Sequence, residues 1–347
     1  MTVAAEQPRR RGARIASLLL LVGLGAAVVV AVRAGQGDPP AVPPPSGSAT
    51  ARESSCVYPS NSIARLDAFS DLVGAPISCV LVFNDVATSW DALVQPWFTV
   101  GEIADHRWDR WVQGDDDRRL VIGQSLIPAG APPDWRQRGA AGEYDAQFAI
   151  LGRRLVAAGL GRSVIRLAHE GNGDWFAHDI GDSDAQNRDW ARYWARVADV
   201  LHDTPGSDFT LDLTVSAGTR AIPLDQWWPG DDAVDVIGVD QHDIAPTAIG
   251  TDQPARWTWQ MTQPGGFETI AAFAAEHGKP LSIPEWGVKD ASEFGAGDDT
   301  YYVARMLQLF TDNDIVYQGF WDKKDTSSEL ARNPGSLELY RRWISGG

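Results

Sequence analysis

Residues 164–176 read VIRLAHEGNGDWF, and this stretch decides how the rest of the chain is interpreted. Residues 164–168 form a mostly apolar run of the kind found in buried strands, and the run ends abruptly in His169 and Glu170. Charged side chains are costly inside a strand that is buried on both faces. The His-Glu pair therefore indicates that this strand ends at an edge of the sheet that solvent reaches.

Short apolar runs alternate with helical patterns along the rest of the chain. Helices are predicted at 63–73, 90–111 (with a break near Pro96), 144–158, 189–202, 267–276 and 300–310. Strands are predicted at 56–58, 77–83, 119–127, 164–168, 209–216, 234–240, 281–285 and 315–321. Eight strands that are apolar on both faces indicate a parallel sheet covered by helices, and eight strands can close a (β/α)8 TIM barrel.

A doubly wound open sheet is the alternative α/β fold, but the sequence has no glycine-rich phosphate-binding loop. In a TIM barrel the chemistry lies at the C-terminal ends of the strands. These strand ends are therefore where catalytic side chains are expected.

The N-terminal region has the pattern of a targeting segment. An arginine-rich stretch precedes an uncharged run over 15–32, which would span about 27 Å as a helix. We predict a basic N-terminus and signal anchor at 1–35, a linker rich in Pro, Ser and Gly at 36–55, and a catalytic domain at 56–347. A cleaved signal peptide is the alternative. The protein is then exported, either membrane-anchored through this segment only and facing outside, or secreted.

Composition narrows the class of ligand. The net charge is −16, which argues against nucleic acid and anionic lipid as partners, whereas the 15 Trp residues offer flat surfaces on which sugar rings stack. Cys56 and Cys79 are the two cysteines. In an exported protein they suggest one disulfide, because the first two barrel strands are neighbours, with two buried thiols as the alternative.

Two glutamates stand at the ends of predicted strands. Glu170 follows the fourth strand, and Glu285 ends the seventh within PEWG at 284–287. Across a barrel mouth they would form a carboxyl pair, in which one acid protonates a glycosidic oxygen and the other, ionised, attacks the anomeric carbon. Taken singly, each is more commonly a solvated loop residue. Their joint position favours hydrolysis of an acetal.

Three stretches resemble glycoside hydrolase family 26, a retaining family best known for β-mannanases. They are RLAHEGNGDW at 166–175, WPGD with VDVIGVDQH between 228 and 242, and KPLSIPEWG at 279–287. The order and spacing hold over roughly 60–320. The resemblance implies that Glu170 is the acid/base, that Glu285 is the nucleophile, that His169 lies in the site, and that Trp321 is the sugar platform.

Further substrate-binding candidates surround this pair. Arg166 would point into the barrel and keep the carboxylate of Glu285 ionised. Asn172 either binds substrate or fixes its turn. Trp175 and Trp286, like Trp321, either stack on sugar or pack in the core.

The chain departs from the family pattern at three positions. His242 replaces a tyrosine that touches the nucleophile, and it can gain a charge near neutral pH. His178 replaces a tryptophan, and Gly171 replaces a larger residue. We expect these changes to line the subsites beside the cleaved bond and to alter the substrate more than the chemistry.

The sequence thus predicts a monomeric retaining glycoside hydrolase that takes a polysaccharide or oligosaccharide, β-1,4-mannan by default, without cofactor or metal. The His and Glu residues lack the spacing of a zinc site, and the acidic run at 115–117 lacks that of a calcium loop. A β-glucan, a β-xylan or an envelope glycan is an alternative substrate. A carbohydrate-binding pseudoenzyme and a structural envelope protein are the alternative functions.

Overall fold

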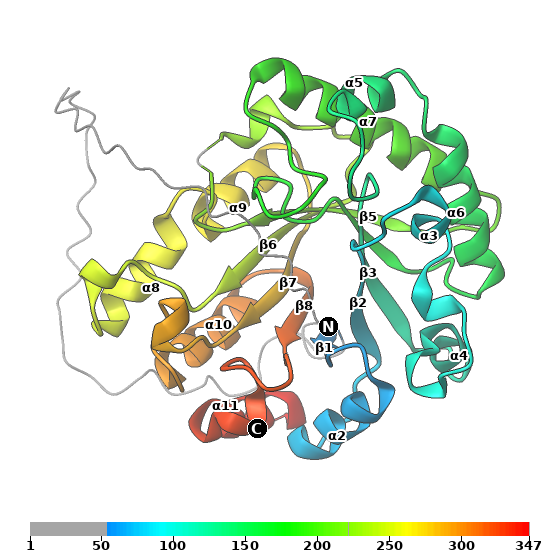
Figure 1. Ribbon diagram of the computed structural model, residues 1–347. Coiled ribbons are helices and arrows are strands. Elements are labelled where there is room, and N and C mark those ends of the chain that lie inside the picture. Colours follow the sequence, from blue (N-terminus) through cyan, green and yellow to red (C-terminus); the bar gives the residue numbers. More distant parts are fainter. Residues whose placement is uncertain (1–53, 221, 347) are drawn as a thin grey trace, which may run out of the picture. The chain divides into compact units, whose positions relative to one another are not determined.

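The computed structural model describes residues 54–220 and 222–346, and within them eight parallel strands close a barrel (Figure 1). The strands are β1 (Ser55–Tyr58), β2 (Cys79–Asn84), β3 (Arg119–Gln124), β4 (Val164–Leu167), β5 (Thr210–Ser216), β6 (Val236–His242), β7 (Leu281–Gly287) and β8 (Ile315–Trp321). β1 pairs with both β2 and β8, so the sheet has no open edge. The predicted barrel is confirmed and the open-sheet alternative is wrong.

Helices surround the barrel (Figure 1). They are α2 (Ile63–Val73), α3 (Trp90–Leu93), α4 (Trp108–Gln113), α5 (Trp135–Ala140), α6 (Asp145–Ala157), α7 (Asp184–His202), α8 (Gln253–Thr262), α9 (Phe267–Glu276), α10 (Thr300–Asp312) and α11 (Pro334–Ser345).

Two connections differ from the regular alternation of strand and helix. The predicted helix over 90–111 is divided into α3, α4 and two short 3-10 turns between them, because Pro96 cannot continue a helix. Between β5 and β6 the described residues form only a 3-10 turn at Leu224–Gln226. This side of the barrel is therefore covered by an irregular segment instead of an α-helix.

The apolar core has two parts. The larger lies between the strands and the helices and contains most of the buried tryptophans, such as Trp190 and Trp194. The smaller lies inside the barrel, where Leu81 and Val121 pack against Tyr317. The C-terminal ends of the strands therefore rest on a well-packed interior.

Polar groups also enter the barrel interior. Asp212 accepts hydrogen bonds from the hydroxyls of Thr214 (2.7 Å), Ser282 (2.6 Å) and Tyr317 (2.6 Å). Burial raises the pKa of Asp212 above its ordinary value, against the lowering effect of these hydroxyls. These hydrogen bonds connect β5, β7 and β8 below the mouth.

The two cysteines join the first two strands. Cys56 and Cys79 are directly paired positions of β1 and β2, with Cα atoms 4.4 Å apart, and they form a disulfide. The bridge holds the short β1 in register against β2. Both residues are buried inside the barrel.

The expected anchor at 1–35 and the expected linker up to residue 53 lie outside the described residues, and Ser55, the last residue of the expected linker, begins β1. In the part of the chain that is described, no helix combines the length and apolarity that crossing a bilayer requires.

Candidate active site

The turn after β4 places Glu170 at the mouth of the barrel. Ala168 and Glu170 both adopt the left-handed region, with φ of 51° and 52°, which is uncommon for residues other than glycine. Two backbone bonds hold this conformation: the N–H of Ala168 donates to Gln124 (2.7 Å), and the N–H of Glu170 donates to Thr214 (3.0 Å). Strands β3 and β5 thus fix the backbone on either side of His169.

His178 holds the same turn from beneath. Its Nε2 donates to the carbonyl oxygen of His169 (2.9 Å), and its Nδ1 accepts from the hydroxyl of Ser125 (2.9 Å). Burial lowers the pKa of His178 to about 3, with a further lowering by His169, so the ring is neutral at physiological pH. The expectation that His178 lines a subsite is wrong, because the residue is fully buried.

Gly171 also serves the packing of this turn. A Cβ atom there would lie 2.9 Å from the ring of Trp190 and 3.2 Å from the carbonyl oxygen of Ala168. The side chain that the family carries here would collide with this ring. The absence of a side chain at Gly171 therefore makes room for the ring of Trp190 and does not open a substrate subsite.

Glu170 is partly exposed and has one tryptophan partner. The indole Nε1 of Trp175 donates to its Oε2 (3.0 Å), and Trp175 itself is 50% exposed at the rim. This carboxyl group is therefore open to solvent on one side and oriented by a side chain five residues further along the chain. A group in that position can exchange a proton with a bound ligand or with water.

Glu285 lies on β7 in a more enclosed environment. The guanidinium Nη1 of Arg166 donates to its Oε1 (2.7 Å), and Nε2 of His242 lies 3.8 Å from its Oε2. Burial raises the pKa of Glu285, but the charge of Arg166 and the neighbouring ring of His242 outweigh burial and lower it to about 2. Glu285 is therefore an ionised carboxylate over the physiological pH range.

Arg166 is shared between two acids. It is fully buried and donates to Asp240 on β6, to Glu285 on β7 and to the hydroxyl of Thr214 (3.1 Å) on β5. Burial raises the pKa of Asp240 well above its ordinary value; Arg166 opposes this rise, and the charges of Glu285 and Glu170 add to it. The charges of Glu170, after β4, and of Glu285, on β7, thus both act on the same buried acid at the floor of the mouth.

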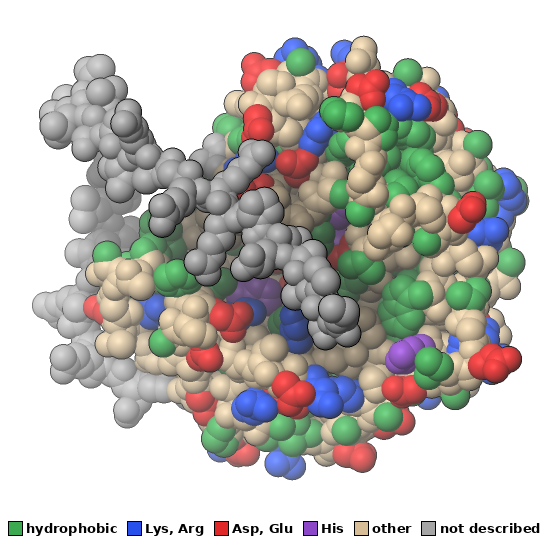
Figure 2. Space-filling view, viewed as in Figure 1, with side chains coloured by type: hydrophobic (Ala, Val, Ile, Leu, Met, Phe, Trp, Pro, Cys, Tyr) green, Lys and Arg blue, Asp and Glu red, His purple; other side chains and the backbone are tan. Residues whose placement is uncertain are grey.

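Aromatic side chains form one wall of the mouth. Trp321, at the end of β8, stacks on Tyr58 with ring centroids 4.1 Å apart, and Phe83 meets both rings edge-on. Trp321 and Tyr58 are partly exposed. Figure 2 shows acidic and histidine side chains beside apolar ones around the hollow of this face. Such a surface suits the apolar face of a sugar ring.

His169 points into the mouth between aromatic rings. It packs against Phe83 and Phe176, and its Nε2 lies 3.6 Å from Asp85 Oδ2. Neither ring nitrogen has a hydrogen-bond partner among the described residues, although the side chain is 1% exposed. A buried imidazole that makes no hydrogen bond, with only the carboxylate of Asp85 near its Nε2, is suited to bond a ligand hydroxyl.

Three residues among the substrate-binding candidates have structural positions. Of the two alternatives for Trp286, packing is found: it is fully buried against Phe310 and Phe320, so it cannot stack on a ligand. The side-chain amide of Asn172 bonds the backbone of Ser216 in both directions (2.8 and 2.9 Å) and therefore fixes the turn. Arg166 points into the barrel and bonds Glu285, as predicted, and it is too deeply buried to reach substrate itself.

The sequence reasoning missed Tyr58 and Asp85. Each follows or ends a strand at the same edge as Glu170 and Glu285, so the rule that located the glutamates could also have located them. Ser125 could not have been found in this way, since its role depends on His178.

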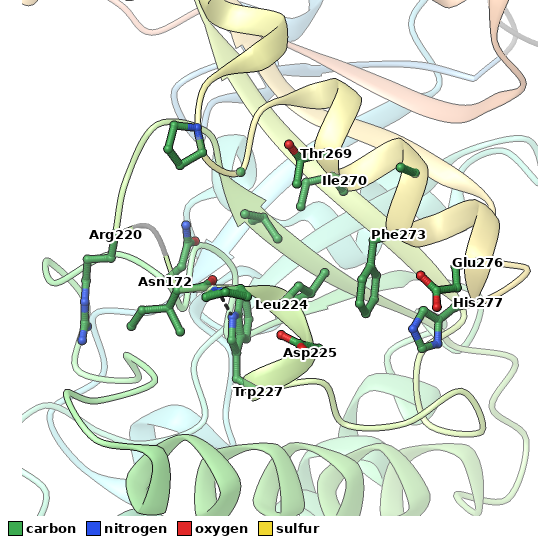
Figure 3. Close-up of a pocket in the computed structure, with 16 residues that line it drawn as sticks. Asn172, Arg220, Leu224, Asp225, Trp227, Thr269, Ile270, Phe273, Glu276 and His277 are labelled. Atoms are coloured by element: carbon green, nitrogen blue, oxygen red, sulfur yellow. Dashed lines mark hydrogen bonds between the residues drawn. The ribbon is translucent and has the colours of Figure 1, made fainter. Parts of the chain in front are cut away.

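A second hollow of about 570 Å³ lies outside the barrel, where the helix between β5 and β6 is replaced (Figure 3). It runs between the segment of Leu224 and Trp227 and the helix α9, with Phe273 at its side. Neither Glu170 nor Glu285 lines it. The described residues contain no group of three or more His, Cys, Asp or Glu side chains arranged to hold a metal.

Comparison with protein families agrees with the motifs. The sequence profile of glycosyl hydrolase family 26 matches residues 155–257, a segment that includes Glu170 and His242 and ends before Glu285. The resemblance to this family is confirmed.

Curated relatives and solved structures extend the comparison. A mannan endo-1,4-beta-mannosidase of Bifidobacterium adolescentis is 27% identical over 215 residues, or 57% of this chain, and endoglucanase H of Acetivibrio thermocellus is 23% identical over 214 residues, or 59% of it. This chain spans only 20% and 22% of the lengths of these two relatives. The structure of Bacillus subtilis mannanase man26 superposes with a TM-score of 0.56 at 14% identity, covering 83% of this chain and 82% of that one, and so agrees in fold.

Proposed function

We propose that this chain, a divergent relative of glycoside hydrolase family 26, hydrolyses the backbone of a β-linked polysaccharide with retention of configuration. The observation that carries the proposal is the contrast between two glutamates at one mouth. Glu285 is enclosed and held ionised by Arg166 and His242, whereas Glu170 is reached by solvent and bonded by Trp175. An ionised and a proton-exchanging carboxyl group are the pair that a double displacement needs.

In the first step Glu170 gives its proton to the glycosidic oxygen while Glu285 attacks the anomeric carbon. The bond between that carbon and the leaving oxygen breaks, and an ester to Glu285 forms. The hydrogen bond from Trp175 occupies Oε2 of Glu170, which leaves the proton to Oε1. Arg166 keeps Glu285 unprotonated and therefore nucleophilic.

In the second step Glu170, now ionised, takes a proton from water. The oxygen of that water attacks the anomeric carbon, the ester to Glu285 breaks, and the product retains its configuration. The stacked pair of Trp321 and Tyr58 is placed to carry the sugar that bears the reacting carbon. His169, whose ring nitrogens make no hydrogen bond within the described residues, is placed to bond one of its hydroxyls.

The test compares three Glu→Gln variants on a panel of β-mannan, β-glucan and β-xylan. Glu285→Gln should lower kcat/KM by more than about 10³-fold, and Glu170→Gln by about 10²- to 10⁴-fold. Glu268→Gln, an exposed position on α9, is the matched control and should retain activity. Activity that survives both active-site changes would show that the assigned pair is wrong.

A second measurement separates the two roles. In Glu170→Gln assayed with an aryl β-glycoside, whose leaving group needs no protonation, azide should restore turnover and give a β-glycosyl azide, because it attacks the ester on Glu285 without needing a base. Glu285→Gln should not respond in this way. If azide restores neither variant, the double displacement is wrong.

The substrate proposal is β-1,4-mannan, supported by the mannan-cleaving relative and the mannanase folds. The endoglucanase among the relatives keeps a β-glucan as the second candidate. Product analysis on the same panel decides between them. Binding of glycans from the panel without cleavage of any of them would favour the alternative of a carbohydrate-binding pseudoenzyme.

Export remains a proposal that rests on the sequence of residues 1–35. Cell fractionation with an antibody to the barrel should find the protein at the outer side of the membrane or in the medium. Recovery from the cytoplasm alone would contradict it.

A further inference from the structure

We propose that a side pocket beside Glu285 binds a single sugar unit that branches from the polysaccharide backbone. The inference rests on the proposed function and adds the class of substrate: a substituted glycan. The side pocket has a volume of about 320 Å³ and is lined by residues that include Ser216, Gln241, His242, Trp259, Gln263 and Phe294. Pockets for small ligands begin at about this size.

The side pocket contains buried polar atoms that have no hydrogen-bond partner among the described residues. Gln241 is 1% exposed, yet neither its Oε1 nor its Nε2 has a hydrogen-bond partner among the described residues. Oδ1 of Asp240 and Nδ1 of His242 also lack partners, but these two side chains lie on the barrel side of β6, so Gln241 is the group that a ligand on the α8 side would pair. Unpaired buried groups of this kind are costly in a protein and become favourable when a ligand pairs them.

The chemistry of these atoms matches adjacent hydroxyl groups. The amide of Gln241 offers one acceptor and two donors on the side of β6 that faces α8. A ring that carries several hydroxyls can satisfy the acceptor and the donors together. An apolar ligand would leave all of them unpaired.

Aromatic side chains supply the opposite kind of contact. Trp259 on α8 is partly exposed, and Phe294, on the loop after β7, is 56% exposed. Sugar rings present apolar C–H faces that pack on such surfaces. The side pocket therefore combines the two surfaces that one sugar unit requires.

The walls of the side pocket are fixed in advance. Buried Asp243 accepts hydrogen bonds from Arg256 and Gln260 of α8, each at 2.9 Å, and from the backbone N–H of Ala296 at 3.1 Å. The N–H of Ala245 donates to the carbonyl of Phe294 (3.2 Å). Helix α8 and the loops after β6 and β7 are thus tied together, so binding requires little ordering.

The direction of the side pocket favours a branch over a backbone unit. Successive side chains of a strand point to opposite faces, so Gln241 lies on the face of β6 opposite to Asp240 and His242. His242 faces the mouth, with Nε2 3.8 Å from Glu285. Because a backbone that reacts at Glu285 would lie on the inner side of β6 while Gln241 faces α8, we assign the side pocket to a substituent and not to a backbone unit.

The test is isothermal titration of the full chain carrying Glu285→Gln with matched oligosaccharides. The ligands are linear and singly branched pentasaccharides of β-mannan, β-glucan and β-xylan. At least one branched ligand should bind about tenfold tighter than its linear counterpart. Adding Gln241→Met should remove that preference, and so should Phe294→Ala, which changes an exposed side chain.

The control is Gln308→Met on α10, which makes the same substitution away from the side pocket and should keep the preference. The proposal is wrong if no branched ligand binds more tightly than its linear counterpart, or if the preference survives both Gln241→Met and Phe294→Ala. Hydrolysis by the unsubstituted chain is measured separately. Branch-dependent binding without hydrolysis would contradict the proposed function and leave the side pocket supported.

Discussion

Replacing Arg166 with methionine should lower the unfolding free energy strongly at neutral pH and less at acidic pH. The pKa of Glu285 is lowered from 4.5 to about 2 in the folded protein, which corresponds to about 3 kcal/mol of stabilisation of its ionised form. Because the folded pKa lies below the ordinary value, this stabilisation is present above pH 4.5 and is lost as the pH falls toward 2.

In Arg166→Met, burial acts on Glu285 and Asp240 without a compensating cation, so the pKa of both carboxyl groups rises. At pH 7 the variant should lose about 3–5 kcal/mol of unfolding free energy, the usual cost of leaving a buried charge unpaired. As the pH falls, both carboxyl groups gain protons and the loss should shrink. The pH dependence of this loss therefore separates the contribution of the Arg166 charge from the contribution of its packing.

The assay is urea unfolding followed by tryptophan fluorescence at pH 7 and at pH 3.5. Arg138→Met is the control, because Arg138 pairs with Glu143 on the surface, where solvent screens the pair, and its loss should leave the unfolding free energy nearly unchanged. An equal loss for Arg166→Met at both pH values would refute the reasoning, since it would mean that Arg166 contributes packing alone.

Three further outcomes are expected. Trp321→Ala should raise KM at unchanged thermal stability, whereas Trp286→Ala should lower the unfolding free energy by about 3–5 kcal/mol, which thermal melts will distinguish. Replacing Cys56 and Cys79 together with alanine should cost about 3 kcal/mol in a urea titration, because the bridge closes a loop with a sequence separation of 23. Gly171→Ala should lower the unfolding free energy by about 1–3 kcal/mol, because the added Cβ would lie only 2.9 Å from the ring of Trp190.

Much of the fold could be predicted because barrel strands are short apolar runs that end at one edge. The same edge rule led to Glu170 and Glu285 without any contact information. The helix predicted at 90–111 was too long, because the apolar spacing continues across Pro96 while the backbone cannot.

The orientation of the tryptophans required a second rule. Glu285 faces the mouth, so its neighbour Trp286 must face the surrounding helices, whereas Trp321 ends its strand on the open side. Alternation along the strand could have excluded Trp286 from the sugar-binding candidates. Composition gives the number of tryptophans and not the direction in which each side chain points.

The role of His178 could not be predicted from sequence. Its partners are the hydroxyl of Ser125 on a different loop and a backbone carbonyl, and neither leaves a pattern in the chain. The same holds for Gly171, whose small size is explained only by the ring of Trp190 from α7. Long-range packing of this kind is set by the whole fold.

The disulfide also determines how the barrel responds to mechanical load. Every residue before 54 is joined to the barrel through β1, a strand of four residues. A pull along that part of the chain would act on β1 in shear, against a few hydrogen bonds to β2 and β8. The covalent bond from Cys56 to Cys79 passes the force from β1 to β2. A load on the N-terminal side would then reach the barrel without separating β1 from β8 at the pair of Tyr58 and Trp321.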